Sequence, residues 1–416
     1  MTYIEFFDRV DAENVCACLS FAPDRVIYIG DDAKAINARI PYYQRVFSDR
    51  DQHIQMEPKS VSRTKLNLAV DQLTKIIQMD DEFVFDITGG SEMFLLALGI
   101  VYEKNPQKKI QIHWFNLMNN TIYDCDKDGK TIYHHVPRLT VAENVRIYGG
   151  DVLFGGVEEE KTYRWNRNAE FLADVDKMWQ ICKMGTHNWN IQMGIFAAAN
   201  EAGEKLDGGL KIKTTVQAVD DQLEKQKSKL VYRNPPGLIK KLLDTKLLTY
   251  FDDSDGTNVT IVFKNHQVKR CLTKAGQLLE LKLYLAAMEA RDDEGKPVYH
   301  DGLNGVLIDW DGKQDGSDTK NEIDILLMHD MIPVFISCKN GYMTADELYK
   351  LETVANRFGS NYAKKVLVAT ALNNMQDQGE SIRDRANDMG ITLKEDVYDR
   401  TDEELSAMMA DVWKKK

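Results

Sequence analysis

The sequence lacks the long apolar segments of a membrane protein. No stretch approaches the roughly 20 consecutive apolar residues that a transmembrane helix needs, and Met1–Asp11 has no signal-peptide pattern. Cysteine is scarce as well, and the six cysteines form no CxxC pair and no Cys/His spacing typical of a zinc site. We therefore expect a cytoplasmic protein with reduced thiols and no membrane partner.

A basic excess is also missing. Lys and Arg number 53 against 65 Asp and Glu, which gives a net charge of -12. Affinity for duplex DNA depends largely on Lys and Arg neutralising phosphates, so this composition argues against a histone-like or general DNA-binding protein. It leaves a nuclease open, because its nucleic-acid contacts would be local and assisted by a metal. The 416 residues, 43% of them apolar, suffice for two or three domains.

The most informative segment that is present is a charged hairpin pattern at Asn321–Gly341. Two short apolar strands are predicted, Glu322–Met328 and Pro333–Cys338, with a polar turn around His329–Asp330. If the two strands pair, the charged residues of both come together over an apolar sheet.

Alternation along the strands decides which side chains meet. Glu322 and Asp324 share one face of the first strand, and Ser337 and Lys339 share one face of the second. Charged side chains are seldom buried unless they are paired or bind a metal. Two interpretations follow: an exposed edge hairpin with its charges in water, or a divalent-metal site with a lysine beside it, which suits phosphodiester hydrolysis.

About 120 residues at the start of the chain alternate strand and helix signals. Strands are expected at Tyr3–Phe7, Arg25–Gly30, His53–Met56, Phe83–Ile87 and Lys109–Asn116, and helices at Glu13–Phe21, Ala35–Phe47, Thr64–Gln78 and Glu92–Tyr102. This alternation predicts a parallel, Rossmann-like α/β sheet with helices on both faces. Ligands of such sheets bind beyond the carboxyl ends of the strands.

One of those strand ends carries the segment Asp86–Met93 (DITGGSEM). Gly89 and Gly90 let the backbone approach a ligand closely, and the following helix offers free amides and a positive dipole end. The segment is therefore a candidate phosphate or nucleotide site. The alternative is that Ser91 only caps the helix after a Gly-Gly turn, with Glu92 favourable in the first turn.

The character of the chain changes at about residue 140. Helices are predicted over Trp165–Met184, His187–Gly203 and Val216–Lys229, with a loop at Gly203–Gly209. A further helix at Leu238–Leu248, followed by two strands, gives a winged-helix-like shape. That shape occurs in DNA-binding modules and in structural connectors. The lack of a dense basic stripe favours a connector.

The last part of the chain predicts an α/β nuclease-like core around the charged hairpin. Its other expected elements are a helix at Leu272–Glu289, a strand at Gly305–Trp310, a helix at Ala345–Phe358, a strand at Lys365–Thr370 and a helix at Glu380–Met389. Within the first helix, Glu280 lies among leucines. It is either a solvated residue on the polar seam or points into the charged cluster of the hairpin.

Two resemblances rest on these motifs. Asp86–Met93, after a strand and opening a helix, resembles the signature of the CRISPR-associated Rossmann fold (CARF), over about residues 1–140. Domains of this kind bind cyclic oligoadenylates across a dimer interface, which implies a homodimer. The implied activator contacts are Thr88, Gly89, Gly90, Ser91, Glu92 and Met93, with Asp8 and Asn14 beyond the first strand. The family usually has Lys or Arg where Glu92 stands, a charge that Lys59, Arg63 or Lys65 could supply.

The second resemblance covers residues 271–416, after a connector at 141–270, and is to the PD-(D/E)xK restriction-endonuclease fold. Glu280 resembles its acidic helix, Asp324 its aspartate position and Ser337-Cys338-Lys339 its (D/E)xK element, with serine in place of the acid. In some members the following helix supplies that acid. Here Glu352 is the expected source and Glu347 the neighbouring alternative.

The combination resembles the Card/Can family of type III CRISPR ancillary nucleases. It implies a nuclease that is activated by cyclic tetra-adenylate and cleaves single-stranded DNA or RNA, with nicking of supercoiled DNA left open. Asp324, the Cys338 carbonyl and Glu352 or Glu322 would hold Mg²⁺ or Mn²⁺. Lys339 would orient water or neutralise charge. The alternative role of Glu322 is to orient the ligands.

Activation would require the first domain to shift an equilibrium in the last, and the middle segment is the expected lever. An alternative function of another class is a cyclic-oligonucleotide-responsive transcription regulator with an inactive nuclease fold. A third alternative is a first domain that degrades its own activator.

Overall fold

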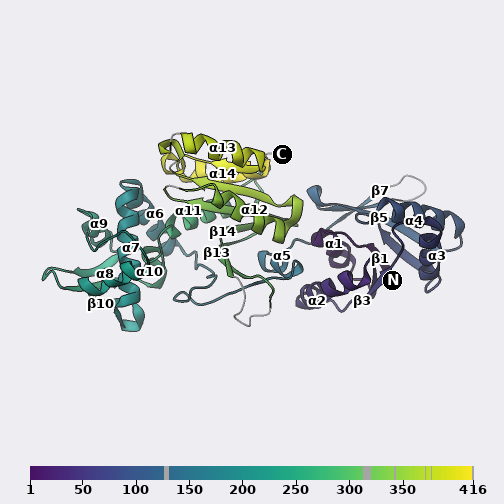
Figure 1. The fold of residues 1–416 in the computed structure, drawn as a ribbon, viewed down its shortest axis with the longest axis horizontal. Helices are drawn as coiled ribbons and strands as arrows, with labels where there is room; N and C mark the ends of the chain where they lie inside the picture. The colour runs from purple at the N-terminus through teal and green to yellow at the C-terminus, as the bar shows by residue number, and fades with distance from the viewer. Residues whose placement is uncertain (126–130, 313–319, 342, 371, 376, 415–416) are drawn as a thin grey trace.

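The computed structural model describes residues 1–125, 131–312, 320–341, 343–370, 372–375 and 377–414. These residues form a mixed α/β structure with three sheets, each of which organises one lobe (Figure 1). The lobes are called N-terminal, middle and C-terminal below. Within the described residues, no helix combines the length and the apolar character needed to cross a membrane.

The N-terminal lobe is built on a sheet with the strand order β3-β2-β1-β4-β5-β6-β7. The first five strands in the chain pair in parallel, and β6 and β7 continue the sheet in antiparallel fashion. The strands are β1 (Thr2–Phe6), β2 (Arg25–Gly30), β3 (Gln55–Ser60), β4 (Glu82–Asp86), β5 (Lys109–Asn116), β6 (Thr121–Cys125) and β7 (Thr131–His135). The helices are α1 (Asp11–Phe21), α2 (Ala33–Asp49), α3 (Leu66–Ile77) and α4 (Glu92–Lys104).

The predicted alternation of strands and helices is confirmed, with one shift. The third strand begins at Gln55, two residues later than the predicted start at His53, and it runs to Ser60. It contains Pro58. Proline lacks an amide donor, and β3 tolerates it because this strand is the edge of the sheet. Helices α3 and α4 pack on one face of the sheet, against Ile4, Phe6 and other apolar residues. Helices α1 and α2 pack on the other.

The middle lobe has the antiparallel strand order β11-β12-β10-β9. Its elements are α6 (Ala169–Lys183), α7 (Thr186–Ala202), β9 (Glu204–Leu206), β10 (Lys211–Thr215), α8 (Val216–Lys225), α9 (Leu238–Asp244), β11 (Leu248–Asp252), β12 (Asn258–Phe263) and α10 (His266–Leu272). The expected helix and two-stranded wing are α9, β11 and β12. The segment expected as a loop at Gly203–Gly209 instead contributes the short edge strand β9.

The C-terminal lobe has the strand order β17-β16-β15-β14-β13-β8. Its elements are β8 (Asp151–Val152), α11 (Gln277–Glu289), β13 (Asp301–Asp309), β14 (Lys320–His329), β15 (Ile332–Lys339), α12 (Asp346–Gly359), β16 (Lys364–Ala369), α13 (Asp377–Asp388), β17 (Ile391–Lys394) and α14 (Asp402–Lys414). The predicted hairpin is β14–β15, antiparallel, with Asp330 at positive φ in its turn. Helices α11 and α14 share a core with one sheet face, and α12 shares a core with the other.

In space the C-terminal lobe lies between the other two, although the middle lobe precedes it in the chain (Figure 1). The N-terminal lobe therefore meets the C-terminal lobe directly, through α5 (Val141–Ile147) and β8. The Asn144 side chain donates to the Phe358 carbonyl (2.7 Å), and the Val141 amide donates to Asp301 (2.7 Å). Strand β8 extends the C-terminal sheet by pairing with β13. Of the segment 141–270, expected as the lever, α5 and β8 lie at this junction, whereas the elements from α6 to α10 lie on the far side of the C-terminal lobe.

Candidate functional site

The charged hairpin brings Asp324, Ser337 and Lys339 together. Asp324 Oδ2 accepts hydrogen bonds from the Cys338 amide (2.6 Å) and the Ser337 hydroxyl (3.2 Å), and it lies 3.8 Å from Lys339 Nζ. The cause is local: the register pairs Ile325 with Ile336, so the next position on each strand places Asp324 opposite Ser337. These groups line a cavity of about 520 Å³ between the hairpin and α12.

Lys339 is held between two carboxylates. Besides Asp324, Glu347 in the first turn of α12 lies 3.0 Å from its Nζ. Burial disfavours the charged ammonium, but Asp324 and Glu347 outweigh this effect and raise the pKa of Lys339 above its ordinary value. Lys339 is therefore a fixed positive charge at neutral pH. It can stabilise an anion, but it cannot serve as a base.

Glu280 belongs to the same site, although it comes from α11. Its side chain is buried, and burial together with the nearby negative charge of Asp324 raises its pKa to about 8. Burial also raises the pKa of Asp324, despite the opposing effects of Lys339 and the Cys338 amide. Of the two positions open to Glu280, the structure shows the one that faces the charged cluster.

Asn304 on β13 connects these groups, and sequence reasoning missed it. Its side chain donates to the Asp324 carbonyl (3.0 Å) and to Glu280 (3.4 Å). It accepts hydrogen bonds from Gln277 (2.8 Å) and from the indole of Trp165 (3.1 Å). Trp165 is 139 positions away in the chain, so no local pattern could have indicated this contact.

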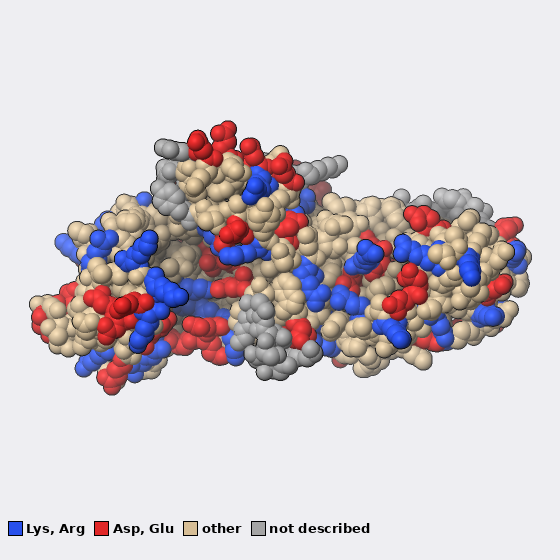
Figure 2. All heavy atoms as spheres, viewed as in Figure 1, with Lys and Arg blue, Asp and Glu red and all other residues tan. Residues whose placement is uncertain are grey.

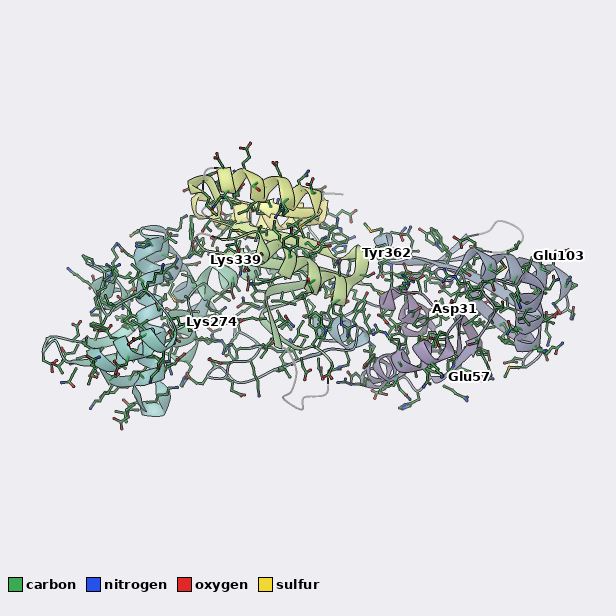
Figure 3. All side chains as sticks on the ribbon, viewed as in Figure 1. Asp31, Glu57, Glu103, Lys274, Lys339 and Tyr362 are labelled. Carbon is green, nitrogen blue, oxygen red and sulfur yellow. The ribbon has the colours of Figure 1, made fainter. Side chains whose placement is uncertain are left out.

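Two of the expected acids have other partners in this structure. Glu352 accepts from Lys365 and from Asn356 (2.9 Å). Glu322 accepts from Lys274, on the turn before α11. Figure 3 shows Lys339 and Lys274 within the C-terminal lobe, on the side toward the middle lobe. The acid on α12 that meets Lys339 is thus Glu347.

The chemistry of the donors fits a hydrated divalent cation. Mg²⁺ is commonly held by one or two carboxylates together with several waters and substrate phosphates. Glu280 and Asp324 are two carboxyl groups close enough for the charge of one to act on the other, and a cation would favour the ionised form of both. Among the described residues, no three His, Cys, Asp or Glu side chains form a ready-made metal cluster. The remaining ligands would therefore be waters and substrate oxygens.

The second candidate site is the loop between β4 and α4. Asp86 accepts from the Thr88 amide (2.8 Å) and from the Thr88 hydroxyl, which in turn accepts from the Phe115 amide (2.7 Å). These bonds fix the loop on the carboxyl edge of the sheet. Burial raises the pKa of Asp86 to about 6. Register pairs Asp86 with Glu5, whose pKa burial raises well above its ordinary value.

Gly89 and Gly90 are required by close packing on β1. A Cβ at Gly89 would stand 2.5 Å from the Phe6 carbonyl oxygen. Gly90 has a φ of +92°, and a Cβ added to it would stand 2.7 Å from Phe6 Cβ. A side chain at either position would push the loop outward. The glycines thus keep the backbone close to the first strand.

Ser91 occupies the N-cap position of α4 but makes no side-chain capping bond. Its hydroxyl is buried, and among the described residues it has no hydrogen-bond partner. The capping alternative therefore does not account for the serine. Glu92 is exposed and Met93 half-buried at the start of the helix. The site thus offers an uncommitted hydroxyl donor beside a helix N-terminus.

Asp8 and Asn14 shape the neighbouring loop after β1. The buried Asn14 side chain accepts from the Asp8 amide (2.8 Å) and donates to the Asp8 carbonyl (2.9 Å) and to the Tyr43 hydroxyl (3.1 Å). Asn14 therefore holds the loop rather than facing a ligand, whereas the Asp8 side chain is at the same edge as Thr88.

The nearby cations have acidic partners. Lys59 pairs with Glu57, and Arg63 lies 3.7 Å from Asp31, with both members of the second pair more than half exposed. Asp31 and Glu57 can be found in Figure 3. An exposed ion pair of this length is weak. Arg63 can therefore readily leave Asp31 to pair with another anion.

Neither a protein-family model nor a curated protein sequence matches the chain. Solved structures share its three-sheet α/β fold over the whole length. Protein VC1899 from Vibrio cholerae is similar with a TM-score of 0.70 and 17% identity, covering 99% of this chain and 98% of that one. Can2 from Sulfobacillus thermosulfidooxidans, in complex with cyclic tetra-adenylate, is similar with a TM-score of 0.65 and 14% identity, with the same coverage of 99% and 98%. At these identities the likeness establishes the fold.

The Glu280 carboxyl predicts a pH-dependent stability of the metal-free chain. Its pKa of about 8 lies above the ordinary 4.5, so stability present below pH 4.5 is lost as pH rises toward 8. The slope for one proton is about 1.4 kcal/mol per pH unit. Glu280→Gln removes this pH dependence. Near pH 8 its free energy of unfolding should exceed that of the wild type.

Denaturant unfolding in EDTA across that pH range provides the measurement. Glu289→Gln, an exposed acid on the same helix, is the matched control and should follow the wild type. Parallel pH profiles for Glu280→Gln and the wild type would contradict the placement of this carboxyl.

Proposed function

We propose that the protein is a divalent-metal-dependent nuclease of the PD-(D/E)xK type, controlled by a cyclic oligoadenylate that binds the N-terminal lobe. The observation that carries the proposal is that Asp324 and Lys339 meet at one cavity, with the buried Glu280 of α11 close enough for the charge of Asp324 to act on it. Single-stranded DNA or RNA is the proposed substrate and cyclic tetra-adenylate the proposed activator.

The proposed chemistry is hydrolysis of a phosphodiester. When bound, Mg²⁺ or Mn²⁺ supplies a water of lowered pKa and offsets charge on the phosphoryl oxygens. Asp324, fixed by the Cys338 amide and the Ser337 hydroxyl, provides a carboxylate of set direction for that ion. Lys339, protonated at neutral pH, places a positive charge where negative charge develops in the transition state.

Glu347 is proposed as the acid that stands in for the one missing at Ser337. It reaches Lys339 from α12 (3.0 Å), whereas Glu352 is committed to Lys365. Glu347 orients the lysine, and its own pKa stays below the ordinary value because Lys350 and Lys339 outweigh the effect of burial. A carboxylate that is ionised at neutral pH suits this role.

The activator site is proposed at the loop Thr88–Ser91. The buried, uncommitted Ser91 hydroxyl, the glycines that keep the backbone close, and the α4 N-terminus are suited to a phosphate of the activator. Arg63 is the nearby cation proposed to replace the positive charge missing at Glu92. The similar fold of Can2, solved with cyclic tetra-adenylate, supports this choice of ligand.

A homodimer is proposed through α4. Leu95 and Leu96 are 39% and 54% exposed, and Gly99 has open space where a side chain would stand. Leu68 on α3 is exposed as well (44%). Three exposed leucines on the neighbouring helices α3 and α4 are suited to burial against a second copy of the chain. The activator loop lies at the start of the same helix.

Helix α12 is proposed as the link between activator and active site. At its first turn Glu347 holds Lys339. Just beyond its end, the Tyr362 hydroxyl hydrogen-bonds Glu13 on α1, and Figure 3 shows Tyr362 at the junction of the two lobes. Glu13 lies within electrostatic range of Asp8 and Asp86 in the sensor loops. A ligand that moves these loops shifts one end of a rigid helix whose other end positions Lys339.

The deciding experiment measures cleavage of labelled single-stranded DNA and RNA with Mn²⁺, with and without cyclic tetra-adenylate. We expect cleavage that depends on both, and a loss of at least about 100-fold for Lys339→Ala. Lys296→Ala, which removes an exposed lysine paired with Glu294, is the control. Activator binding without any cleavage would instead favour a regulator with an inactive nuclease fold.

Tyr362→Phe should uncouple the two sites. Loss of the hydroxyl removes the contact with Glu13, so stimulation by the activator should fall about tenfold or more while activator affinity changes less than about threefold. Tyr250→Phe, which removes a hydroxyl that donates to Asp252 (3.3 Å) in the middle lobe, is the matched control. Unchanged stimulation in Tyr362→Phe would refute this route.

Leu96→Glu should convert the dimer to a monomer, because it places a charge in the proposed apolar contact. Light scattering coupled to size exclusion gives the mass directly. Met79→Glu changes a comparably exposed residue (49%) after α3 and should leave the dimer intact. A wild-type chain that is monomeric at all concentrations, with activator present, would rule out the proposed dimer.

A further inference from the structure

A second cavity lies between the middle and C-terminal lobes. It has a volume of about 640 Å³, and Figure 2 shows a hollow with both blue and red side chains between these lobes. Its walls come from the segment after β8, from α7, β9 and α10, and from β13 and β14. The residue Glu322 lines both this cavity and the one that holds Asp324 and Lys339. The two cavities therefore meet at Glu322.

Of the five cations that line this second cavity, Lys269 and Arg270 are occupied by structural contacts. Lys269 is buried against Glu158 (2.6 Å). The Arg270 guanidinium donates to the carbonyls of Val157, Glu159 and Lys161, each at 2.8 Å. These bonds fasten the segment after β8 to α10. The two cations thus build the wall of the cavity and are not available to a ligand.

Lys274 is the cation beside the active-site cavity, because its partner lines both cavities. It pairs with Glu322, and the two side chains are 39% and 47% exposed. A half-exposed ion pair contributes little net free energy, so a phosphate group can replace Glu322 as the partner. Lys274 also stands close to the catalytic acids, since its positive charge acts on Glu280.

Resting on the proposed nuclease function, we propose that the substrate strand runs from the active site into this cavity, where Lys274 binds a backbone phosphate by exchanging it for Glu322. Lys274 is then a positioning residue. Glu322 is the carboxylate that pairs with Lys274 until the substrate binds. This assigns Glu322 a part in substrate entry rather than in the chemistry.

The charges of the cavity select a single strand over a duplex. Glu159, Glu160 and Glu201 line it together with Lys274, Lys161 and Lys205, and Lys161 pairs with Glu159 (3.0 Å). A single strand can turn its phosphates toward Lys274 and its bases toward the other wall. A duplex presents a phosphate backbone on both sides and would bring one of them against these carboxylates.

The test is direct binding, measured by fluorescence anisotropy of a labelled oligothymidylate in EDTA, so that no cleavage occurs. Lys274→Gln should raise Kd about tenfold and lower the slope of log Kd against log salt by about 0.7, the value for one phosphate contact of a single strand. Lys274→Arg should restore most of the affinity. Glu322→Gln should tighten binding, because it frees Lys274 in advance. Lys296→Gln is the matched control.

The outcomes separate this inference from the function on which it rests. If the wild type binds and Lys274→Gln matches Lys296→Gln in both Kd and salt slope, the assignment of Lys274 is wrong while the nuclease proposal stands. If a duplex of the same length binds more tightly than the single strand, the proposed selection is wrong. If the wild type binds no nucleic acid and cleaves none with activator and Mn²⁺, the proposed function itself fails.

Discussion

The C-terminal lobe depends on keeping two carboxyl groups, those of Glu280 and Asp324, close together out of water. Like charges in a poorly polarisable interior repel far more strongly than in solvent. The fold offsets this locally: Asp324 receives an amide and a hydroxyl from β15, and Glu280 receives the side-chain amides of Gln277 and Asn304. Trp165, from the segment that precedes the middle lobe, completes the set. The pair is thus maintained by chain segments that have no proximity in sequence.

The junction of the N-terminal and C-terminal lobes is a packed core, not a flexible tether. Val145 and Ile147 of α5 are buried in an apolar cluster that also contains Tyr28 of β2 and Phe335 of β15. Close-packed interiors change by discrete rearrangement rather than by gradual deformation. Polar contacts such as the bidentate pair of Arg50 with Glu143 (2.7 and 2.9 Å) surround this core. Movement across the junction would therefore involve whole elements, which is why α12 suits the proposed role of link.

Local periodicity in the sequence predicted much of the fold. The alternation along Glu322–Met328 predicted the hairpin, and the strand-loop-helix order predicted the place of the Asp86–Met93 loop; the structure confirms both elements. The acid beside Lys339 could not be predicted in this way. Glu347 and Glu352 lie on the same helix, and the choice between them depends on Lys365, a residue of β16 that pairs with Glu352. The place of the middle lobe, and the contact between Trp165 and Asn304, likewise depend on tertiary packing that no local pattern records.

Strand β8 gives the molecule a property that its linear order conceals. The last sheet is completed by two residues that precede the entire middle lobe, and α5 just before them fills the core beneath it. A fragment beginning at the middle lobe would leave the edge of β13 unpaired and an apolar face uncovered, and such edges recruit other chains. Proteolysis that removed the N-terminal lobe together with α5 and β8 would thus yield an aggregating remnant rather than a soluble C-terminal lobe. Architecture of this kind ties the C-terminal lobe to the N-terminal lobe through the folding of the C-terminal lobe itself.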